Sequence, residues 1–206
     1  MEHRIAVDRD RFQAVHTLVE NRELDGERVL RVVKAEKIDQ PDENTYARLT
    51  GLIFHNGVIS VKMRSRLLPD APSHARGFIG IAFRIGGDDA SFESFYVRPT
   101  NGRTEDPVRR AHGCQYFSYP TYTFSYFREH GITRYEAPVD IGLDEWIQLT
   151  AVIEDSCGKF YLNGGETPVL TVEDFKHGPH ASGAVGFFVD IGTEAFFKDL
   201  RIIPWD

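Results

Sequence analysis

The stretch EWIQLTAVIEDSCGKFYLNGGETPVLTV, from Glu145 to Val172, decides the fold class of this chain. It contains two runs rich in β-branched and aromatic residues, EWIQLTAVIE and KFYLNG, and such runs are typical of β-strands. The second run ends in Asn163-Gly164-Gly165, and these residues tolerate the positive φ angles of a tight turn. The sequence therefore predicts a hairpin between KFYLNG and the TPVLTV segment that follows it.

Strand signals of the same kind, separated by turn residues, recur along most of the chain. They are VLRVVK (Val29 to Lys34), GVISVKMRSRL (Gly57 to Leu67), GFIGIAFRI (Gly77 to Ile85), SFESFYVR (Ser91 to Arg98), SGAVGFFVD (Ser182 to Asp190) and EAFFKDLRII (Glu194 to Ile203). FQAVHTLVE, from Phe12 to Glu20, fits either a helix or a strand by its spacing. Many strands with almost no helix predict an all-β antiparallel sandwich, in a single domain over residues 1–206.

Composition argues against several classes of partner. The chain has 206 residues, of which 41% are hydrophobic, so it can bury a sizeable core. Its net charge of −7 argues against nucleic acid as a partner, and its apolar stretches are too short to span a membrane. The opening residues, MEHRIAVDRDRF, lack the apolar segment of a signal peptide. We therefore expect a cytoplasmic protein, or a secreted one whose leader was removed, of undetermined oligomeric state.

Strand alternation assigns side chains to faces. In GVISVKMRSRL the apolar set faces the core and Arg64 lies on the opposite face. In GFIGIAFRI, Arg84 shares its face with small residues, and in SFESFYVR, Tyr96 and Arg98 share one face. If these strands are neighbours, the four side chains stand around one shallow surface. A solvated sheet face is the alternative.

Three stretches resemble a known group of proteins. HTLVENRELDGERVLRV is similar to an opening pair of strands, the stretch from Glu145 to Val172 to a strand and hairpin, and SGAVGFFVDIGTEAFFKDLRII to a closing pair. Together they resemble the concanavalin A-like lectin/glucanase superfamily, and most closely its 3-keto-disaccharide or 3-keto-glycoside hydrolase-like domains. The resemblance implies a jelly-roll of two antiparallel sheets and a carbohydrate ligand on the concave sheet. Its motifs specify the sandwich and no reaction.

The chain departs from the glucanases of that superfamily. Those enzymes place carboxylates at alternate positions of one strand, about 5–5.5 Å apart. Here the strand offers Glu93 alone, and Val97 stands where another carboxylate could follow. Many relatives bind calcium, and Asp190 and Glu194 could supply oxygen ligands, although a polar turn is the alternative and we predict no cofactor or metal.

The two cysteines, Cys114 and Cys157, are too few to form a disulfide scaffold in a chain of this length. We expect two reduced thiols inside a cell, and the alternative is a single bridge, which the sequence does not decide.

The segment from Phe92 to Tyr126 is the densest in reactive and sugar-binding residue types. Between Phe92 and His112, the sequence contains four arginines and three acidic residues, which is a local excess of positive charge in an acidic chain. Guanidinium groups suit a carboxylate, a phosphate or a polarised keto group. The following CQYFSYPTYTFSYFREH is aromatic, and we interpret it as a long loop that stacks on sugar rings or covers the open end of the sandwich.

From these patterns we predict the following candidate site. His112 is the first catalytic candidate because its pKa lies near neutrality, and Glu93 is the second, with an ion pair as its alternative role. The predicted ligand-binding residues are Arg64, Arg84, Tyr96, Arg98, Asn101, Arg103, Arg110, Gln115 and Tyr116.

The function expected from the sequence is that of a carbohydrate-active protein, a glycoside or keto-glycoside hydrolase working by general acid/base chemistry. One alternative is a non-catalytic carbohydrate-binding module, and another is a small-molecule enzyme of specialised metabolism on the same fold. The expected partner is a carbohydrate or glycoside-like molecule, with no nucleic acid and no membrane. A deep pocket closed by residues 115–127 favours a small-molecule enzyme, and a long open groove favours a polymer ligand.

Overall fold

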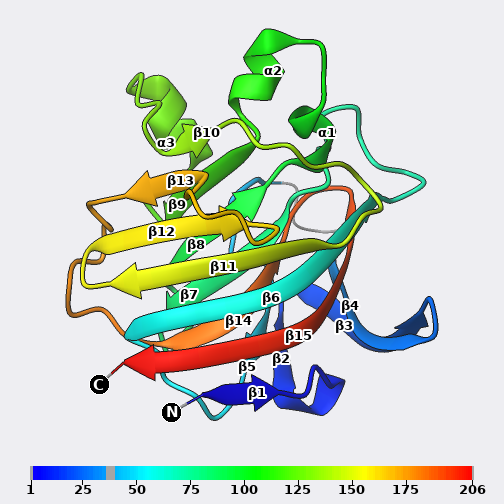
Figure 1. The fold of residues 1–206 in the computed structure, drawn as a ribbon, viewed down its shortest axis with the longest axis vertical. Helices are drawn as coiled ribbons and strands as arrows, with labels where there is room; N and C mark the ends of the chain where they lie inside the picture. Colours follow the sequence, from blue (N-terminus) through cyan, green and yellow to red (C-terminus); the bar gives the residue numbers. More distant parts are fainter. Residues whose placement is uncertain (1, 36–39, 206) are drawn as a thin grey trace.

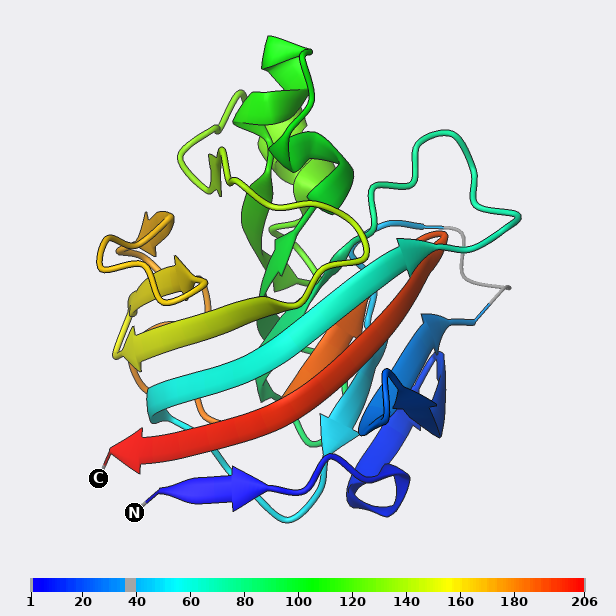
Figure 2. The same ribbon diagram turned by 45° about the vertical axis from the view of Figure 1, so that its right-hand side comes forward.

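A computed structural model describes residues 2–35 and 40–205, and most of them lie in two antiparallel β-sheets packed face to face (Figures 1 and 2). Sheet A has the strand order β13-β12-β11-β6-β15-β4-β3, and β1 pairs with β15. Its strands are β1 (His3–Ile5), β3 (Thr17–Leu24), β4 (Glu27–Lys34), β6 (Asn56–Leu67), β11 (Ile147–Glu154), β12 (Cys157–Leu162), β13 (Leu170–Val172) and β15 (Thr193–Trp205).

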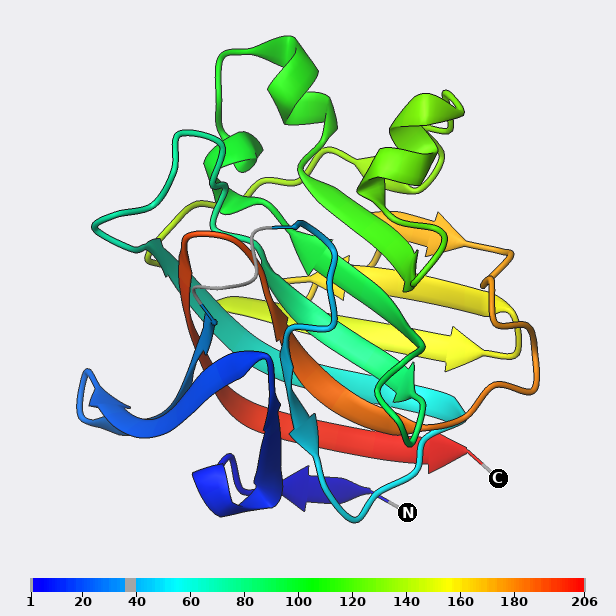
Figure 3. The same cartoon turned by 180° about the vertical axis from the view of Figure 1, so that it is seen from behind.

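Sheet B has the order β10-β9-β8-β7-β14-β5-β2 and is seen best from behind (Figure 3). Its strands are β2 (Phe12–Val15), β5 (Tyr46–Leu49), β7 (Ile79–Ile85), β8 (Phe92–Val97), β9 (Cys114–Tyr119), β10 (Glu136–Ala137) and β14 (Ala184–Val189). The predicted antiparallel jelly-roll sandwich of two sheets is therefore confirmed.

The helices are short. A 3-10 helix, η1, spans Arg9–Arg11, and three α-helices follow sheet B strands: α1 (Pro99–Gly102), α2 (Pro107–Ala111) and α3 (Phe124–Glu129). The three α-helices gather at one end of the sandwich, drawn in green in Figure 1. Within residues 2–35 and 40–205, none of the helices has the length and apolar character needed to cross a bilayer.

Aromatic stacking between the sheets forms the main core. The rings of Phe95 and Phe160 stack with centroids 4.3 Å apart, and those of Phe187 and Phe197 do the same at 4.3 Å. Each pair joins one residue of sheet B to one of sheet A. The alternation predicted for β6 is confirmed, since Ile59, Val61 and Met63 are buried and the residues between them are only partly buried. In β7, by contrast, every residue is buried.

The outer face of sheet B carries a second apolar layer. Tyr96, Phe117 and Phe188 pack there in edge and tilted contacts. Asp42, in the segment before β5, accepts from the Phe124 N–H at 2.5 Å, which ties that segment to the start of α3. Sheet B is therefore buried on both faces over much of its area.

Several expectations for local structure are settled by the backbone. Asn163 and Gly164 have φ angles of 52° and 73°, and β12 pairs with β13, so the predicted turn is confirmed. FQAVHTLVE forms two strands, β2 and β3, separated at His16, whose φ is 46°.

The expectation of a long aromatic loop after Cys114 is wrong, because these residues form β9 and α3. Cys114 is buried, Cys157 is exposed, and no bridge joins them.

Candidate functional site

A cavity of about 440 Å³ lies at the helical end of sheet B. Four of the predicted site residues, Tyr96, Arg98, Asn101 and His112, line it together. Its other polar lining residues are His74, Arg76, Arg109 and Arg128, which the sequence alone did not single out, and Asp190, which the sequence suggested only as a calcium ligand. Phe78 and Phe124 add aromatic surface. A volume of this size is typical of small-ligand pockets.

His112 lies beside a buried carboxylate. Its Nδ1 is 2.9 Å from Oε2 of Glu136, a side chain only 5% exposed. The contact lies outside hydrogen-bond geometry, so Nδ1 has no hydrogen-bond partner among the described residues. The charge of the nearby carboxylate still favours the tautomer with its proton on Nδ1, which leaves the lone pair on Nε2. Burial lowers the pKa of His112, the Glu136 charge raises it, and the nearby Arg128 and Arg98 lower it. The net direction is downward, so the imidazole is neutral at neutral pH.

Arg98 organises the floor of the cavity. One terminal nitrogen donates to Glu136 Oε1 at 2.8 Å and to the His112 carbonyl at 3.2 Å. The other donates to the Tyr96 hydroxyl at 2.9 Å and to Gln115 Oε1. Arg98 is almost fully buried, so these contacts hold it rigidly. Its terminal nitrogens are thus engaged with the protein, and its main effect is to position Tyr96 and Glu136.

Helix α2 sets the position of Arg109 and His112. Asp106 caps the helix by accepting from the backbone N–H groups of Val108 and Arg109, at 2.9 and 3.2 Å. Asn101 then fixes both residues, because its amide group donates to the His112 carbonyl at 3.0 Å and accepts from Arg109 Nε at 3.1 Å. Arg109 and His112 are three positions apart and therefore lie on the same side of the chain.

A pair of acidic residues lies beneath the cavity. Asp190 accepts from Lys34 Nζ at 2.6 Å and from the Asp42 N–H at 2.9 Å. Asp42 is fully buried, and its Oδ1 has no hydrogen-bond partner among the described residues. Burial, followed by the Asp190 charge, raises the pKa of Asp42 to about 7. Asp42 therefore binds a proton over a pH range in which an exposed aspartate is ionised.

Replacement of Glu136 by Gln is expected to lower the pKa of His112, because the carboxylate charge that raises it is lost while Arg98 and Arg128 remain. The amide also presents a donor to Nδ1, which disfavours the tautomer with a free Nε2. An NMR titration of the imidazole measures this directly, with Glu129→Gln, an exposed acid of α3, as the matched control. A His112 pKa that is unchanged or raised would show that Glu136 does not act on it.

Arg103 and Arg110, two of the predicted ligand residues, lie outside the cavity and near each other. Arg103 pairs with Asp140 at 2.6 Å and with Glu145 at 2.9 Å. Arg110 donates to the Thr104 carbonyl at 2.9 Å. Both line a separate depression next to Gly102 and the segment 138–140. Arg110 is kept out of the cavity by helical geometry. It follows Arg109 directly on α2, and adjacent residues of a helix point in different directions.

Glu93, Tyr116 and Arg84 face the space between the sheets. Glu93 is fully buried and accepts from the Tyr116 hydroxyl and from the His177 N–H, the latter at 2.8 Å. Arg84 has a φ of 52°, beside an irregularity in the β14–β7 pairing, and donates to the Asp155 carbonyl at 2.7 Å. Glu93 therefore does not reach the cavity, and the bulge turns Arg84 away from the face predicted for it.

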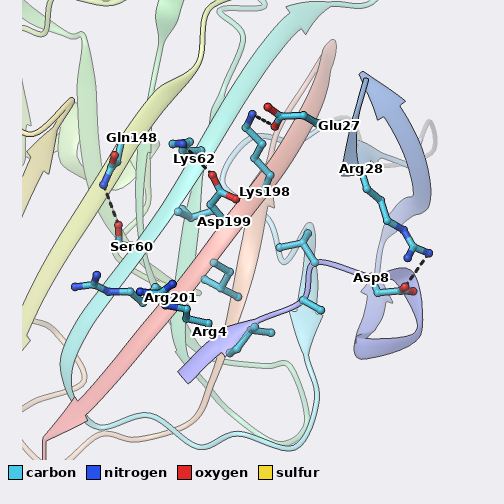
Figure 4. A pocket seen from close by; sticks show the side chains of 15 residues that line it. Arg4, Asp8, Glu27, Arg28, Ser60, Lys62, Gln148, Lys198, Asp199 and Arg201 are labelled. Carbon is cyan, nitrogen blue, oxygen red and sulfur yellow. Dashed lines mark hydrogen bonds and ion pairs between the residues drawn. The ribbon is translucent and has the colours of Figure 1, made fainter. Parts of the chain in front are cut away.

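Arg64 was predicted to share a surface with Tyr96, and this is wrong because β6 belongs to sheet A and β8 to sheet B. Arg64 instead lies on the outer face of sheet A and pairs with Asp25 and Asp144, each at 2.7 Å. The same face carries a wide depression around β15, β6 and β1 (Figure 4).

Most charged groups of that depression are paired with one another, and Arg4 and Arg201 are paired with Glu2 beside it. Lys62 contacts Asp199 at 2.9 Å, Arg28 contacts Asp8 at 2.9 Å, and Lys198 contacts Glu27 (Figure 4). Such internal pairing is typical of a solvated sheet face, and it leaves little charge for a ligand.

The two residues considered as calcium ligands are each paired with a cation. Asp190 binds Lys34, and Glu194 accepts from Arg31 Nε at 2.7 Å. Over the part of the chain that the structure describes, no three His, Cys, Asp or Glu side chains come together as metal ligands.

Some of the site residues that we did not predict had a recognisable signal in the sequence, and others had none. Arg109 could have been preferred to Arg110, because Asp106-Pro107 marks a helix start and places positions 109 and 112 on one side. Glu136 had no local signal, since β10 reaches Gln115 only through sheet pairing. Arg76 lies in the long β6–β7 connection, and only the folded chain brings it to the cavity.

Comparison with known proteins gives the fold. No protein-family model matches the sequence, and no curated protein matches it. Among solved structures, the carbohydrate-binding module CBM66 from Bacillus subtilis is 11% identical with a TM-score of 0.58, over 93% of this chain and 98% of that one. A structure described as a native glycosidic hydrolase is 12% identical with a TM-score of 0.56, over 100% of this chain and 96% of that one.

A third similar structure, a Bacillus subtilis protein of unknown function with a galectin-like fold, is 11% identical with a TM-score of 0.52. The alignment covers 93% of this chain and 97% of that one. Identities this low carry information about architecture and none about chemistry. The chain therefore shares the jelly-roll β-sandwich fold of these structures.

Proposed function

We propose that the protein cleaves the glycosidic bond of a small keto-glycoside in the cavity at the helical end of sheet B, with His112 as the base. The observation that carries this proposal is the 2.9 Å contact between His112 Nδ1 and the buried Glu136. A neutral imidazole whose Nδ1 faces a carboxylate is suited to accept a proton at Nε2.

The form of the cavity supports a small substrate. Phe124 and Arg128 of α3 close one side of it, and Val108, Arg109 and His112, within and just after α2, line another. A volume of about 440 Å³ suits one or two sugar rings better than a polymer. Phe78 and Phe124 offer aromatic faces on which the C–H groups of a sugar ring can pack.

The acid groups of the cavity do not suit ordinary glycoside hydrolysis. That reaction uses two carboxylates, one on each side of the scissile bond. Among the described residues that line the cavity, Asp190 is the one carboxylate, and Lys34 and backbone N–H groups already occupy it. A single histidine base is therefore better matched to a substrate whose own chemistry makes the bond easy to break.

A keto group provides that chemistry. In a 3-keto-glycoside, carbon 2 lies between the ketone and the anomeric carbon, so its proton is acidic. His112 Nε2 takes this proton, the electron pair forms a double bond to carbon 1, and the bond from carbon 1 to the aglycone oxygen breaks. The aglycone leaves with a proton returned by the imidazolium, and water adds to the double bond to complete hydrolysis. Arg128, 3.3 Å from Glu136, stabilises negative charge on the ketone oxygen.

A turnover assay tests this function. Purified protein is incubated with matched pairs of glycosides and 3-keto-glycosides, and with soluble polysaccharides, and aglycone release is followed by chromatography. We expect release from the keto-glycosides and none from the parent glycosides. Binding without release would assign the protein to non-catalytic carbohydrate binding, and release from polysaccharides would contradict the small-substrate proposal.

A further inference from the structure

The cavity carries an excess of positive charge. Four arginines line it, Arg76, Arg98, Arg109 and Arg128, against the single carboxylate of Asp190 among the described lining residues. The chain as a whole is acidic, with a net charge of −7. A cationic pocket in an acidic protein is therefore a local feature that the bulk composition does not explain.

Part of this charge is neutralised inside the protein. Glu136 accepts from both Arg98 and Arg128, at 2.8 and 3.3 Å. Asp190 is neutralised by Lys34 at 2.6 Å. These pairs leave the guanidinium groups of Arg76 and Arg109, which form no ion pair with any described residue of the chain.

The hydrogen bonds of the two groups leave donors free. Arg76 donates through one terminal nitrogen to the carbonyl groups of Ser73 and Ala75, each at 2.8 Å. Arg109 donates through Nε and Nη2 to Asn101 and Thr100, at 3.1 to 3.2 Å. Among the described residues, Nε and Nη2 of Arg76 and Nη1 of Arg109 have no acceptor.

The two guanidinium groups also act on each other. Burial lowers the pKa of Arg76, and the charges of Arg109 and Arg98 lower it further. Like charges held close together in a partly buried wall cost free energy in the empty protein. An anion placed between them would remove that cost and satisfy the free donors with charge-assisted hydrogen bonds.

We propose that Arg76 and Arg109 form a binding site for an anionic group, a carboxylate or a phosphate, carried by the sugar that enters the cavity. The identity of that ligand as a sugar rests on the proposed function. The anion site itself rests on the two unpaired guanidinium groups and on the cavity they line. The depression on sheet A in Figure 4 differs from this cavity in one respect. Its lysines and Arg28 form ion pairs with acids of the same face, whereas Arg76 and Arg109 form none with the described residues.

Titration calorimetry tests the site with three probes that share one ring: methyl glucoside, methyl glucuronoside and glucose 6-phosphate. Binding is measured for the wild type, Arg76→Gln, Arg109→Gln and Arg110→Gln. Arg110 is the matched control, because it belongs to α2 but lines the separate depression near Asp140. We expect at least one anionic probe to bind more tightly than methyl glucoside. Each variant at Arg76 or Arg109 is expected to weaken that binding about tenfold, with Arg110→Gln unchanged.

The pair of anionic probes distinguishes a carboxylate from a phosphate. Equal binding of all three probes, or equal losses in Arg109→Gln and Arg110→Gln, would overturn the anion site. If a neutral keto-glycoside is cleaved but neither anionic probe binds more tightly than methyl glucoside, the anion site is wrong and the proposed function stands. If the anionic probes bind through Arg76 and Arg109 but keto-glycosides are never cleaved, the proposed function is wrong and the anion site stands.

Discussion

Replacement of His112 by Gln is expected to lower kcat for keto-glycoside cleavage about 10²- to 10⁴-fold, the usual contribution of a positioned general base. Glutamine keeps a polar side chain of similar reach but cannot accept a proton at neutral pH. Substrate affinity should change little, because Arg109 and the aromatic walls remain. Initial rates and the KM of the variant, measured at several pH values, separate the loss of proton transfer from a loss of binding.

The matched control is His130→Gln. His130 lies at the end of α3, where it is exposed and bonded to the Tyr126 carbonyl at 2.8 Å, and it does not line the cavity. Its replacement should leave kcat unchanged. A His112→Gln variant that is folded by circular dichroism and retains wild-type kcat would exclude His112 as the base, and equal losses in the two histidine variants would point to a general effect on folding.

Replacement of Asp42 by Asn is expected to stabilise the protein above neutral pH by as much as about 4 kcal/mol, because a pKa raised by about three units corresponds to a free energy of this order. The pKa of Asp42 rises from its ordinary 3.8 to about 7 on folding. Between these values the native state holds one proton more than the unfolded state. The free energy of unfolding of the wild type therefore falls as pH rises through this window and levels off above it.

Asparagine suits this position for three reasons. It is neutral at every pH, its side-chain oxygen can accept from the Phe124 N–H as the carboxylate does, and it tolerates the φ of 55° found at residue 42. Urea unfolding at about pH 5 and about pH 8.5 measures the effect. We expect a gain at the higher pH that shrinks at the lower one. A variant that is less stable than the wild type at the higher pH would contradict a buried proton on Asp42.

The fold was largely predictable because its signals are local. The Asn163-Gly164 turn needs only two adjacent residues with positive φ, and the alternation of β6 needs only one buried face. The assignment of β6 to a sheet was not local. β6 and β7 are consecutive, but the long connection between them, residues 68–78, carries the chain from sheet A to sheet B. Residues of consecutive strands therefore came to lie on different sheets.

The candidate site was predictable in part for the same reason. Tyr96, Arg98, Asn101 and His112 come from one continuous stretch, and the structure brings them to one cavity. Glu136, which orients His112, arrives from a strand whose neighbour in space is β9. The segment from Cys114 to Tyr119 was expected in a loop that is rich in aromatic residues, yet it forms a strand of sheet B that is buried on both faces.

The measurement that tests the central claim most directly is a crystal structure of the His112→Gln variant with a 3-keto-glycoside bound. We predict that the sugar occupies the cavity between β8 and the three α-helices. Carbon 2 should lie within about 3 to 3.5 Å of the residue 112 side chain, the separation of reacting groups in productive complexes. A sugar bound instead on the outer face of sheet A, in the depression of Figure 4, would contradict the account. So would a sugar in the cavity with carbon 2 turned away from residue 112.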